Sequence, residues 1–471
     1  MLFNSLDFSV FLPIVFALYW FVTNHNLKLQ NALIVAASYV FYGWWDWRFL
    51  SLIIFSTLVD YSIGRRLKYE DRQSNRKILL WISITVNLGF LGFFKYYNFF
   101  LDNFVAAFLF FGQEIQPNTL NIILPVGISF YTFQTLSYTI DVYKKKLEPT
   151  EDLIAFSAFV CFFPQLVAGP IERASNLLTQ INGKRRFEYE RFKEGLLQIT
   201  VGFFRKIVIA DTLAIYVDNV FNAADIHGSS TLMFAMILYS FQIYFDFAGY
   251  SDIAIGVAKL FGFEFKQNFN LPYFSKSITD FWRKWHMSLS FWLRDYLYVP
   301  LGGNRHGKVS QYRNLLITML LGGLWHGSSW NFVVWGLIHG LLLSIEKLLQ
   351  TTDNQSILRS IFSRIYTYTM VCLAWVFFRS SDLNQAVTIF ENIIIKHDID
   401  FYMSTRDVFF TILFVLPLGI ALDTVLYLNK IPLEILGSKL KNGQLIAVVC
   451  VLIQLIFLFY SKSENFIYFQ F

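Results

Sequence analysis

Charged residues are scarce in this sequence. Asp, Glu, Lys and Arg make up only 15% of its 471 residues, whereas an ordinary soluble domain carries roughly 25%. Hydrophobic residues make up 55%, and the mean hydropathy is +0.46. The shortage of charge excludes an ordinary soluble globular protein, and the long apolar runs predict an all-α polytopic membrane protein embedded in a lipid bilayer.

Cysteine is also rare. The three cysteines, Cys161, Cys372 and Cys450, lie in apolar runs and form no CxxC pair, so neither a disulfide framework nor a zinc knuckle is indicated. We interpret all three as small core residues. The net charge of +6 comes mostly from loops, and no basic stripe contains interleaved exposed aromatic residues. We therefore expect no nucleic-acid partner.

The sequence shows neither a cleavable leader nor an internal boundary. Met1 to Val22 has no basic start and no small-residue cleavage site, so Ser9 to Val22 is expected to remain as the first helix. No repeat, linker or low-complexity tract divides the chain. We predict one membrane domain over residues 1–471, with a catalytic core at roughly 120–345. It would contain about 11 transmembrane helices plus re-entrant and interfacial amphipathic helices. Basic residues at 65–77 indicate a cytoplasmic loop.

Two segments contain features that a lipid-facing helix does not tolerate. Leu124 to Phe130 contains a helix-breaking Pro-Val-Gly, and Tyr131 to Tyr143 is rich in hydroxyl and amide side chains. Such backbone occurs at membrane depth only where it is buried in protein or lines a cavity. We therefore place this segment in the interior. For Phe162 to Arg173, where two prolines end a span, an interior position and an ordinary helix end fit equally well.

Two carboxylates, Asp246 and Asp252, follow a run that is long enough to span the membrane. They are close enough in sequence to share acid–base work. Structural pairing with basic neighbours such as Lys259 is the favoured interpretation.

Histidines are concentrated between Asp280 and Gly340, where four of the seven occur: His286, His306, His326 and His339. A histidine in an apolar run of spanning length is costly to keep and therefore indicates function. His326 is such a residue. A neutral imidazole suits a general base, because its ordinary pKa is about 6.5 and burial keeps it neutral.

The start of this stretch has the pattern of one amphipathic helix. From Thr279 to Tyr296, aromatic and aliphatic residues recur at helical spacing, with basic residues on the other face. Ser277 provides an N-terminal cap. This pattern predicts a helix that lies in the membrane interface or under the bundle. His286 falls at the edge of the apolar arc, so the pattern alone favours a half-buried ring with a wet tip.

The remaining histidines give weaker signals. Leu301 to Lys308 is a glycine-rich basic loop suited to an anionic ligand, but it has no phosphate-loop spacing. We therefore assign no cofactor-binding residues and interpret His306 as a solvated loop residue. His326 and His339 are thirteen residues apart with no Cys, Asp or Glu at ligand spacing. A metal site is thus poorly supported, and His339 is interpreted as structural.

Several passages together resemble the membrane-bound O-acyltransferase (MBOAT) family, and within it the membrane subunits of alginate O-acetyltransferases. They are spread from Gly127 to the carboxy terminus, and several are long, which makes the resemblance specific. The matching passages are Gly127 to Tyr143, Ala168 to Arg173, Tyr244 to Gly256, Ser277 to Asn304, Leu320 to Gly340 and Phe466 to Phe471.

The resemblance implies a function and a site. The histidine of Trp-His-Gly, His326, corresponds to the catalytic residue of the family, and His286 in Phe-Trp-x-x-Trp-His corresponds to the second polar position of the active site. The implied activity is membrane O-acyl transfer, with acetyl the expected group. No cofactor is permanently bound, and the donor is acetyl-coenzyme A or an acyl carrier thioester on the cytoplasmic side.

The resemblance also implies partners and a location. The acceptor is an exported polysaccharide, reached directly or through an extracytoplasmic acyltransferase partner protein. The expected location is the bacterial inner membrane. Two other classes stay open on the residues alone: a polytopic polysaccharide or small-molecule transporter and a catalytically idle scaffold. The sequence does not specify the acceptor polymer or the oligomeric state.

Overall fold

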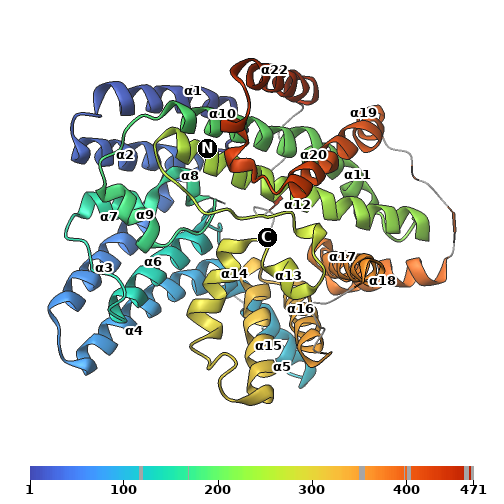
Figure 1. Ribbon diagram of the computed structural model, residues 1–471. Coiled ribbons are helices and arrows are strands. Elements are labelled where there is room, and N and C mark those ends of the chain that lie inside the picture. Colours follow the sequence, from blue (N-terminus) through green and yellow to red (C-terminus); the bar gives the residue numbers. More distant parts are fainter. Residues whose placement is uncertain are drawn as a thin grey trace. The chain divides into compact units, whose positions relative to one another are not determined.

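The computed structural model describes residues 1–115, 120–167, 169–349, 356–396, 398–399, 402, 405–460 and 466–467. The elements that these residues form are all helices, and no β-strand occurs among them (Figure 1). The predicted all-α class is therefore confirmed.

Polar caps explain where several helices begin. The side chains of Ser5, Asn26, Asp152, Ser356 and Asp382 each accept a hydrogen bond from a main-chain N–H in the first turn of the helix that follows. Such caps satisfy amide groups that have no partner inside the helix. They mark the starts of helices whose apolar composition does not itself specify an end.

The chain forms two compact units. The first consists of residues 1–188 and 258–265, and the second of residues 189–257 and 266–471. The helices of the first unit are α1 (Leu6–Ala17), η1 (Leu18–Val22), α2 (Leu27–Asp46), η2 (Trp47–Phe49), α3 (Leu50–Tyr69), α4 (Gln73–Leu91), η3 (Gly92–Tyr96), α5 (Tyr97–Phe110), α6 (Ile128–Tyr143), α7 (Leu153–Cys161), α8 (Phe163–Leu166) and α9 (Ala174–Asn182).

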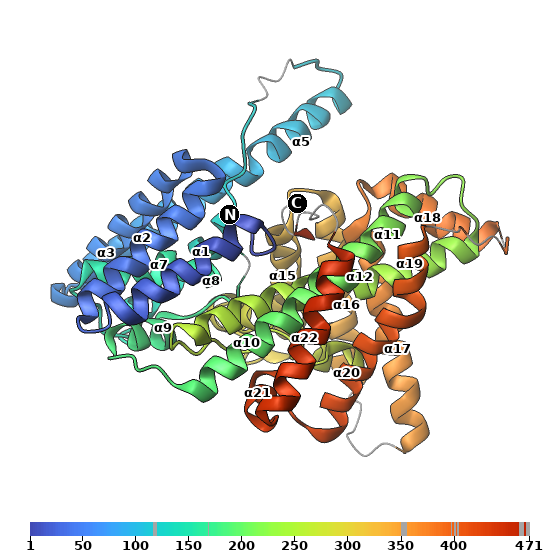
Figure 2. The same ribbon diagram turned by 90° about the horizontal axis from the view of Figure 1, so that it is seen from above.

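The first unit is built around the polar helix α6. Almost all of its residues are buried, and it packs against α3 and α4. Buried Asp60 on α3 accepts hydrogen bonds from Ser83 and Asn87 on α4 and from Thr139 on α6. The predicted interior position of this segment is confirmed. By contrast, α5 has no buried residue and extends away from the other helices of its unit (Figure 2).

The second unit holds the histidine-rich stretch. Its helices are α10 (Tyr189–Phe203), η4 (Phe204–Ala210), α11 (Asp211–Asn222), α12 (Ser229–Leu260), η5 (Pro272–Phe274), α13 (Ile278–Trp282), α14 (Met287–Leu293), η6 (Arg294–Tyr298), α15 (Gly307–His326), α16 (Trp330–Leu349), α17 (Ile357–Arg379), α18 (Leu383–Ile395), α19 (Arg406–Phe410), η7 (Thr411–Val415), α20 (Leu416–Asn429), η8 (Leu433–Ile435), α21 (Leu436–Lys439) and α22 (Asn442–Phe459). The last residues of α12 belong to the first unit.

Helix α12 is the central helix of the second unit. In the most apolar 18-residue stretch of α12, 72% of the residues are buried, whereas in the corresponding stretch of α22 only 6% are buried. It crosses α10 closely, because a Cβ added at Gly202 would lie 2.7 Å from the main-chain oxygen of Gly249. Close backbone approach at small residues is a common way to pack helices in membranes. On its other side, α10 lies beside α22 (Figure 2).

Among the described residues, six helical segments are long and apolar enough to cross a membrane: 73–110, 229–260, 330–349, 357–379, 406–429 and 442–459. Shorter apolar helices lie at Leu6–Val22 and Leu383–Ile395. The protein is therefore a multi-pass membrane protein. The predicted total of about 11 transmembrane helices remains a prediction. The single membrane domain over residues 1–471 also remains a prediction.

The cysteines are not all in the core. Cys161 and Cys372 are buried, as predicted, whereas Cys450 is exposed on α22. The prediction for Cys450 is wrong because an apolar run in a membrane protein also covers the surface that faces lipid, so hydropathy does not distinguish core from periphery.

Candidate functional site

His326 is the last residue of α15. Helices α15 and α16 form a tightly packed hairpin (Figure 1), in which a Cβ added at Gly323 would lie 2.1 Å from the main-chain oxygen of Phe332. The residue after His326 must also be glycine for steric reasons, since a Cβ on Gly327 would lie 2.1 Å from the Phe332 ring. The hairpin thus holds His326 in the interior, with only 4% of its surface exposed.

We predict that Gly323→Ala destabilises the protein. The added methyl group overlaps the backbone of α16, so the two helices must separate, at a cost of about 1–3 kcal/mol typical of an overpacked interior. Thermal unfolding of the purified protein measures this as a lower midpoint.

The matched control is Gly89→Ala. Gly89 lies inside α4, where an added Cβ would have no atom within 4 Å apart from its chain neighbours and the nearby backbone of its own helix. Alanine favours a helix over glycine by about 0.5–1 kcal/mol, so this variant should unfold at the same or a higher temperature. Equal midpoints for both variants would contradict the packing described for the hairpin.

His286 lies at a break that the sequence pattern does not predict. Ser277 caps α13 as expected, since its Oγ accepts from the Asp280 N–H at 3.1 Å. The predicted single helix is wrong, however, because α13 ends at Trp282 and α14 begins only at Met287. Between them His286 adopts left-handed backbone angles, φ 40° and ψ 55°.

The break changes the environment of His286. Its ring is fully buried, with 0% exposure, so the expected half-buried position at the helix edge is also wrong. A non-glycine residue in the left-handed region costs about 1–3 kcal/mol and persists where the surroundings enforce it, often at functional sites. Burial lowers the pKa of the His286 imidazole well below its ordinary value, so the ring is neutral at neutral pH.

The fold brings His286 and His326 together from segments forty residues apart. Their ring centroids are 6.4 Å apart. At this distance between the two rings, one oxygen atom can make a hydrogen bond of about 2.6–3.2 Å to each imidazole. The two imidazoles can therefore act on one substrate hydroxyl.

Aromatic side chains surround both imidazoles. Phe247 packs on His286 with 4.6 Å between centroids, and Trp335 and Phe378 pack on His326 at 5.1 and 5.3 Å. Trp325 contacts both histidines. Such surroundings exclude water, which strengthens electrostatic interactions within the site and protects a reactive intermediate from hydrolysis.

The other two histidines have the roles that the sequence suggests. His306 is exposed in the loop before α15. His339 is fully buried on α16, where its Nδ1 accepts a hydrogen bond from Trp282 Nε1 at 3.3 Å. It thereby links α13 to α16. In the described part of the chain, no group of three or more His, Cys, Asp or Glu side chains is arranged to hold a metal ion.

A buried ionic network lies on α12 in the same unit. Arg205 in η4 donates to Asp252 at 2.6 Å and to Asp423 on α20, and the Tyr244 hydroxyl donates to Asp423 at 2.7 Å. Lys206, the next residue, pairs with Asp211 and Asp246. The predicted structural pairing of Asp246 and Asp252 is confirmed, with Arg205 and Lys206 as the partners.

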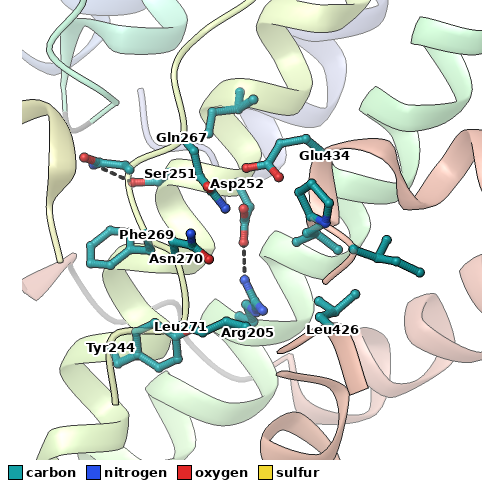
Figure 3. A pocket seen from close by; sticks show the side chains of 15 residues that line it. Arg205, Tyr244, Ser251, Asp252, Gln267, Phe269, Asn270, Leu271, Leu426 and Glu434 are labelled. Carbon is teal, nitrogen blue, oxygen red and sulfur yellow. Dashed lines mark hydrogen bonds and ion pairs between the residues drawn. The ribbon is translucent and has the colours of Figure 1, made fainter. Parts of the chain in front are cut away.

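A narrow polar pocket opens beside this network. Arg205, Ser251, Asp252 and Asn268 line it, and the Arg205–Asp252 ion pair crosses it (Figure 3). Its volume of about 40 Å³ is enough for a few water molecules. The Arg205 and Asp252 side chains of the buried network therefore border this small pocket.

Part of the closing Phe466 to Phe471 passage contacts the same helix. The Phe466 ring stacks on Tyr250 at 4.6 Å and packs on Phe247 at 5.6 Å, and the Ile467 N–H donates to Asp246 at 3.0 Å. Residues 468–471, like Ala168 of another matching passage, lie outside the described residues.

The sequence pattern does not identify Asp423 or Asn268. Asp423 lies in a plain apolar span, and Asn268 lies in a connecting loop without periodicity. A signal for Asp423 exists, because two adjacent cations in an apolar run, Arg205 and Lys206, require carboxylates elsewhere in the membrane. No comparable signal points to Asn268.

Comparison with known proteins places this sequence in a family. Residues 150–380 match the model of the membrane-bound O-acyltransferase family. This range includes His286, His326 and the ionic residues Arg205, Asp246 and Asp252.

Curated relatives align over most of the chain. A probable alginate O-acetylase of Azotobacter vinelandii is 43% identical over 388 residues, which cover 82% of this chain and 76% of the relative. A peptidoglycan O-acetyltransferase of Helicobacter pylori is 35% identical over 84% of this chain and 80% of the relative. A teichoic acid D-alanyltransferase of Bacillus subtilis is 29% identical over 55% of this chain and 69% of the relative.

Proposed function

The chain belongs to the membrane-bound O-acyltransferase family and is an acyltransferase that acts on polysaccharide, and we propose that it O-acetylates an exported polymer with His326 as general base. The observation that carries this proposal is the pair of buried imidazoles, His286 and His326, 6.4 Å apart inside an aromatic enclosure.

The geometry supports a simple acyl transfer. His326 takes the proton of the attacking hydroxyl while the hydroxyl oxygen forms a bond to the thioester carbonyl carbon. The carbon–sulfur bond then breaks, and the leaving thiolate takes the proton back from the His326 imidazolium. His286 contacts the same oxygen and orients it. Because His286 is neutral, its ring can donate one hydrogen bond without charge repulsion toward the imidazolium.

The acyl donor in this proposal is a cytoplasmic thioester, acetyl-coenzyme A or an acyl carrier protein. Acetyl is favoured because two of the relatives are named as O-acetyl-transferring enzymes. D-alanyl, the group named for the Bacillus relative, is the competing acyl group. Which group is transferred affects only the small end of the donor, and the role of His326 is the same for both.

The acceptor lies beyond the membrane in this proposal. The relatives are named for alginate, peptidoglycan and teichoic acid, which are hydroxyl-bearing polymers. We propose that the chain resides in the bacterial inner membrane and passes the acyl group to such a polymer, either directly or through an extracytoplasmic acyltransferase partner.

Reconstitution tests the donor. The protein is placed in proteoliposomes with ¹⁴C-acetyl-coenzyme A or ¹⁴C-acetyl-acyl carrier protein, and release of free thiol is measured together with label on an added oligosaccharide. We expect thiol release with at least one donor and label on the sugar or on the partner protein. A transporter would instead move labelled sugar across the membrane without consuming either donor, and that result would refute the acyltransferase proposal.

A further inference from the structure

His286 occupies the N-cap position of α14 but does not cap it. The residue at this position ordinarily uses its side chain to accept a hydrogen bond from the first-turn amides of the helix. The His286 side chain makes no such bond. Its ring lies instead against Phe247, with 4.6 Å between centroids, and faces His326.

Asn268 performs the capping from another segment. Its main-chain oxygen accepts from the Met287 N–H at 2.8 Å, and its Oδ1 accepts from the Ser288 N–H at 3.2 Å and from the Ser288 hydroxyl at 2.9 Å. Met287 and Ser288 are the first two residues of α14, immediately after His286. Asn268 thus accepts hydrogen bonds from two first-turn amides to which the His286 side chain does not bond.

Asn268 is itself fixed in place. It is fully buried, and its Nδ2 donates to Ser251 Oγ on α12 at 3.1 Å. Asp252, the next residue of α12, pairs with Arg205 (Figure 3). The cap is therefore anchored to the largely buried helix α12.

We propose that Asn268 is a positioning residue, which caps α14 in place of His286 and so holds the His286 ring in its left-handed backbone conformation, facing His326. This inference rests on the proposed role of His286 in acyl transfer. The physical reason is that the left-handed conformation of His286 costs about 1–3 kcal/mol, and the three hydrogen bonds that Asn268 accepts from Met287 and Ser288 offset that cost.

The test compares Asn268→Ala with Asn268→Asp. Alanine removes the side-chain cap, so kcat for ¹⁴C-acetyl-coenzyme A should fall by about 10²-fold, the cost of misplacing a reacting group by about 1 Å, with KM little changed. Aspartate keeps the acceptor oxygen, and the Ser251 hydroxyl can rotate to donate to it. We expect kcat of Asn268→Asp to stay close to the wild-type value.

Asn270→Ala is the matched control. Asn270 lies two residues further along the same loop and is exposed, so this variant should turn over like the wild type. A second comparison separates positioning from general damage. If Asn268 acts through His286, then Asn268→Ala should reduce kcat no further in a His286→Ala background.

Four results would overturn the inference: normal kcat in Asn268→Ala when His286→Ala is impaired, equal loss in the two backgrounds, a hundredfold loss in folded Asn268→Asp, or a KM effect alone. If the alanine variant does not fold, the aspartate variant decides. If the wild type does not consume acetyl-coenzyme A, the proposed donor fails separately, and the same variants are compared by the alkali-labile ester content of the polymer made by cells.

Discussion

His326→Ala should abolish nearly all acyl transfer while leaving the protein folded. A positioned general base contributes about 10²–10⁴-fold in rate. In the proposed transfer His286 donates a hydrogen bond to the attacking oxygen and does not take its proton, and the Nδ1 of His339 already accepts a hydrogen bond from Trp282. The measurement is turnover of labelled donor by reconstituted protein, with a thermal unfolding curve to show that the variant is folded.

His306→Ala is the matched control, because His306 is exposed in the loop before α15 and its loss should leave turnover unchanged. His326→Gln adds a second criterion. Glutamine keeps hydrogen-bonding capacity but cannot take a proton, so an enzyme stays inactive whereas a permeation path would tolerate the polar replacement. Near-normal turnover in folded His326→Ala would refute the assignment of the base.

Arg205→Ala should cause the largest loss of stability. The guanidinium joins Asp252 on α12 to Asp423 on α20, and the side chains of all three residues are at most 10% exposed. Removing one partner of a buried ion pair leaves uncompensated charge and typically costs about 3–5 kcal/mol. We expect a clearly lower unfolding midpoint in detergent, and a smaller yield of monodisperse protein.

An exposed ion pair provides the comparison. Arg294 contacts Asp295 at 2.6 Å, but its side chain is 56% exposed, and pairs of this kind contribute about 0–1 kcal/mol. Arg294→Ala should therefore unfold near the wild-type midpoint. Adding Asp252→Asn and Asp423→Asn to Arg205→Ala should restore part of the loss, because the two carboxylates are then no longer charged. Equal midpoints for Arg205→Ala and Arg294→Ala would contradict the network.

The sequence by itself determined the class of the protein. Low charge and long apolar runs require a helical membrane protein, since backbone polar groups in lipid must be satisfied within helices. The polar segment that became α6 had to be interior for the same reason. The predicted importance of His326 also follows from local facts, because one histidine in an apolar run is costly wherever the neighbouring helices lie.

Only the tertiary structure decided what surrounds these residues. Helical periodicity assumes an unbroken helix, so it placed His286 at a wet edge, whereas the break before Met287 turns the ring inward. Periodicity also cannot show that Arg205 pairs with Asp423, over two hundred positions away, or that Asn268 caps α14. These contacts depend on which helices pack together. The choice of packing partners depends on close backbone approach at residues such as Gly202 and Gly323 and on side-chain packing summed over the unit. No local stretch of sequence therefore specifies which helices pack together.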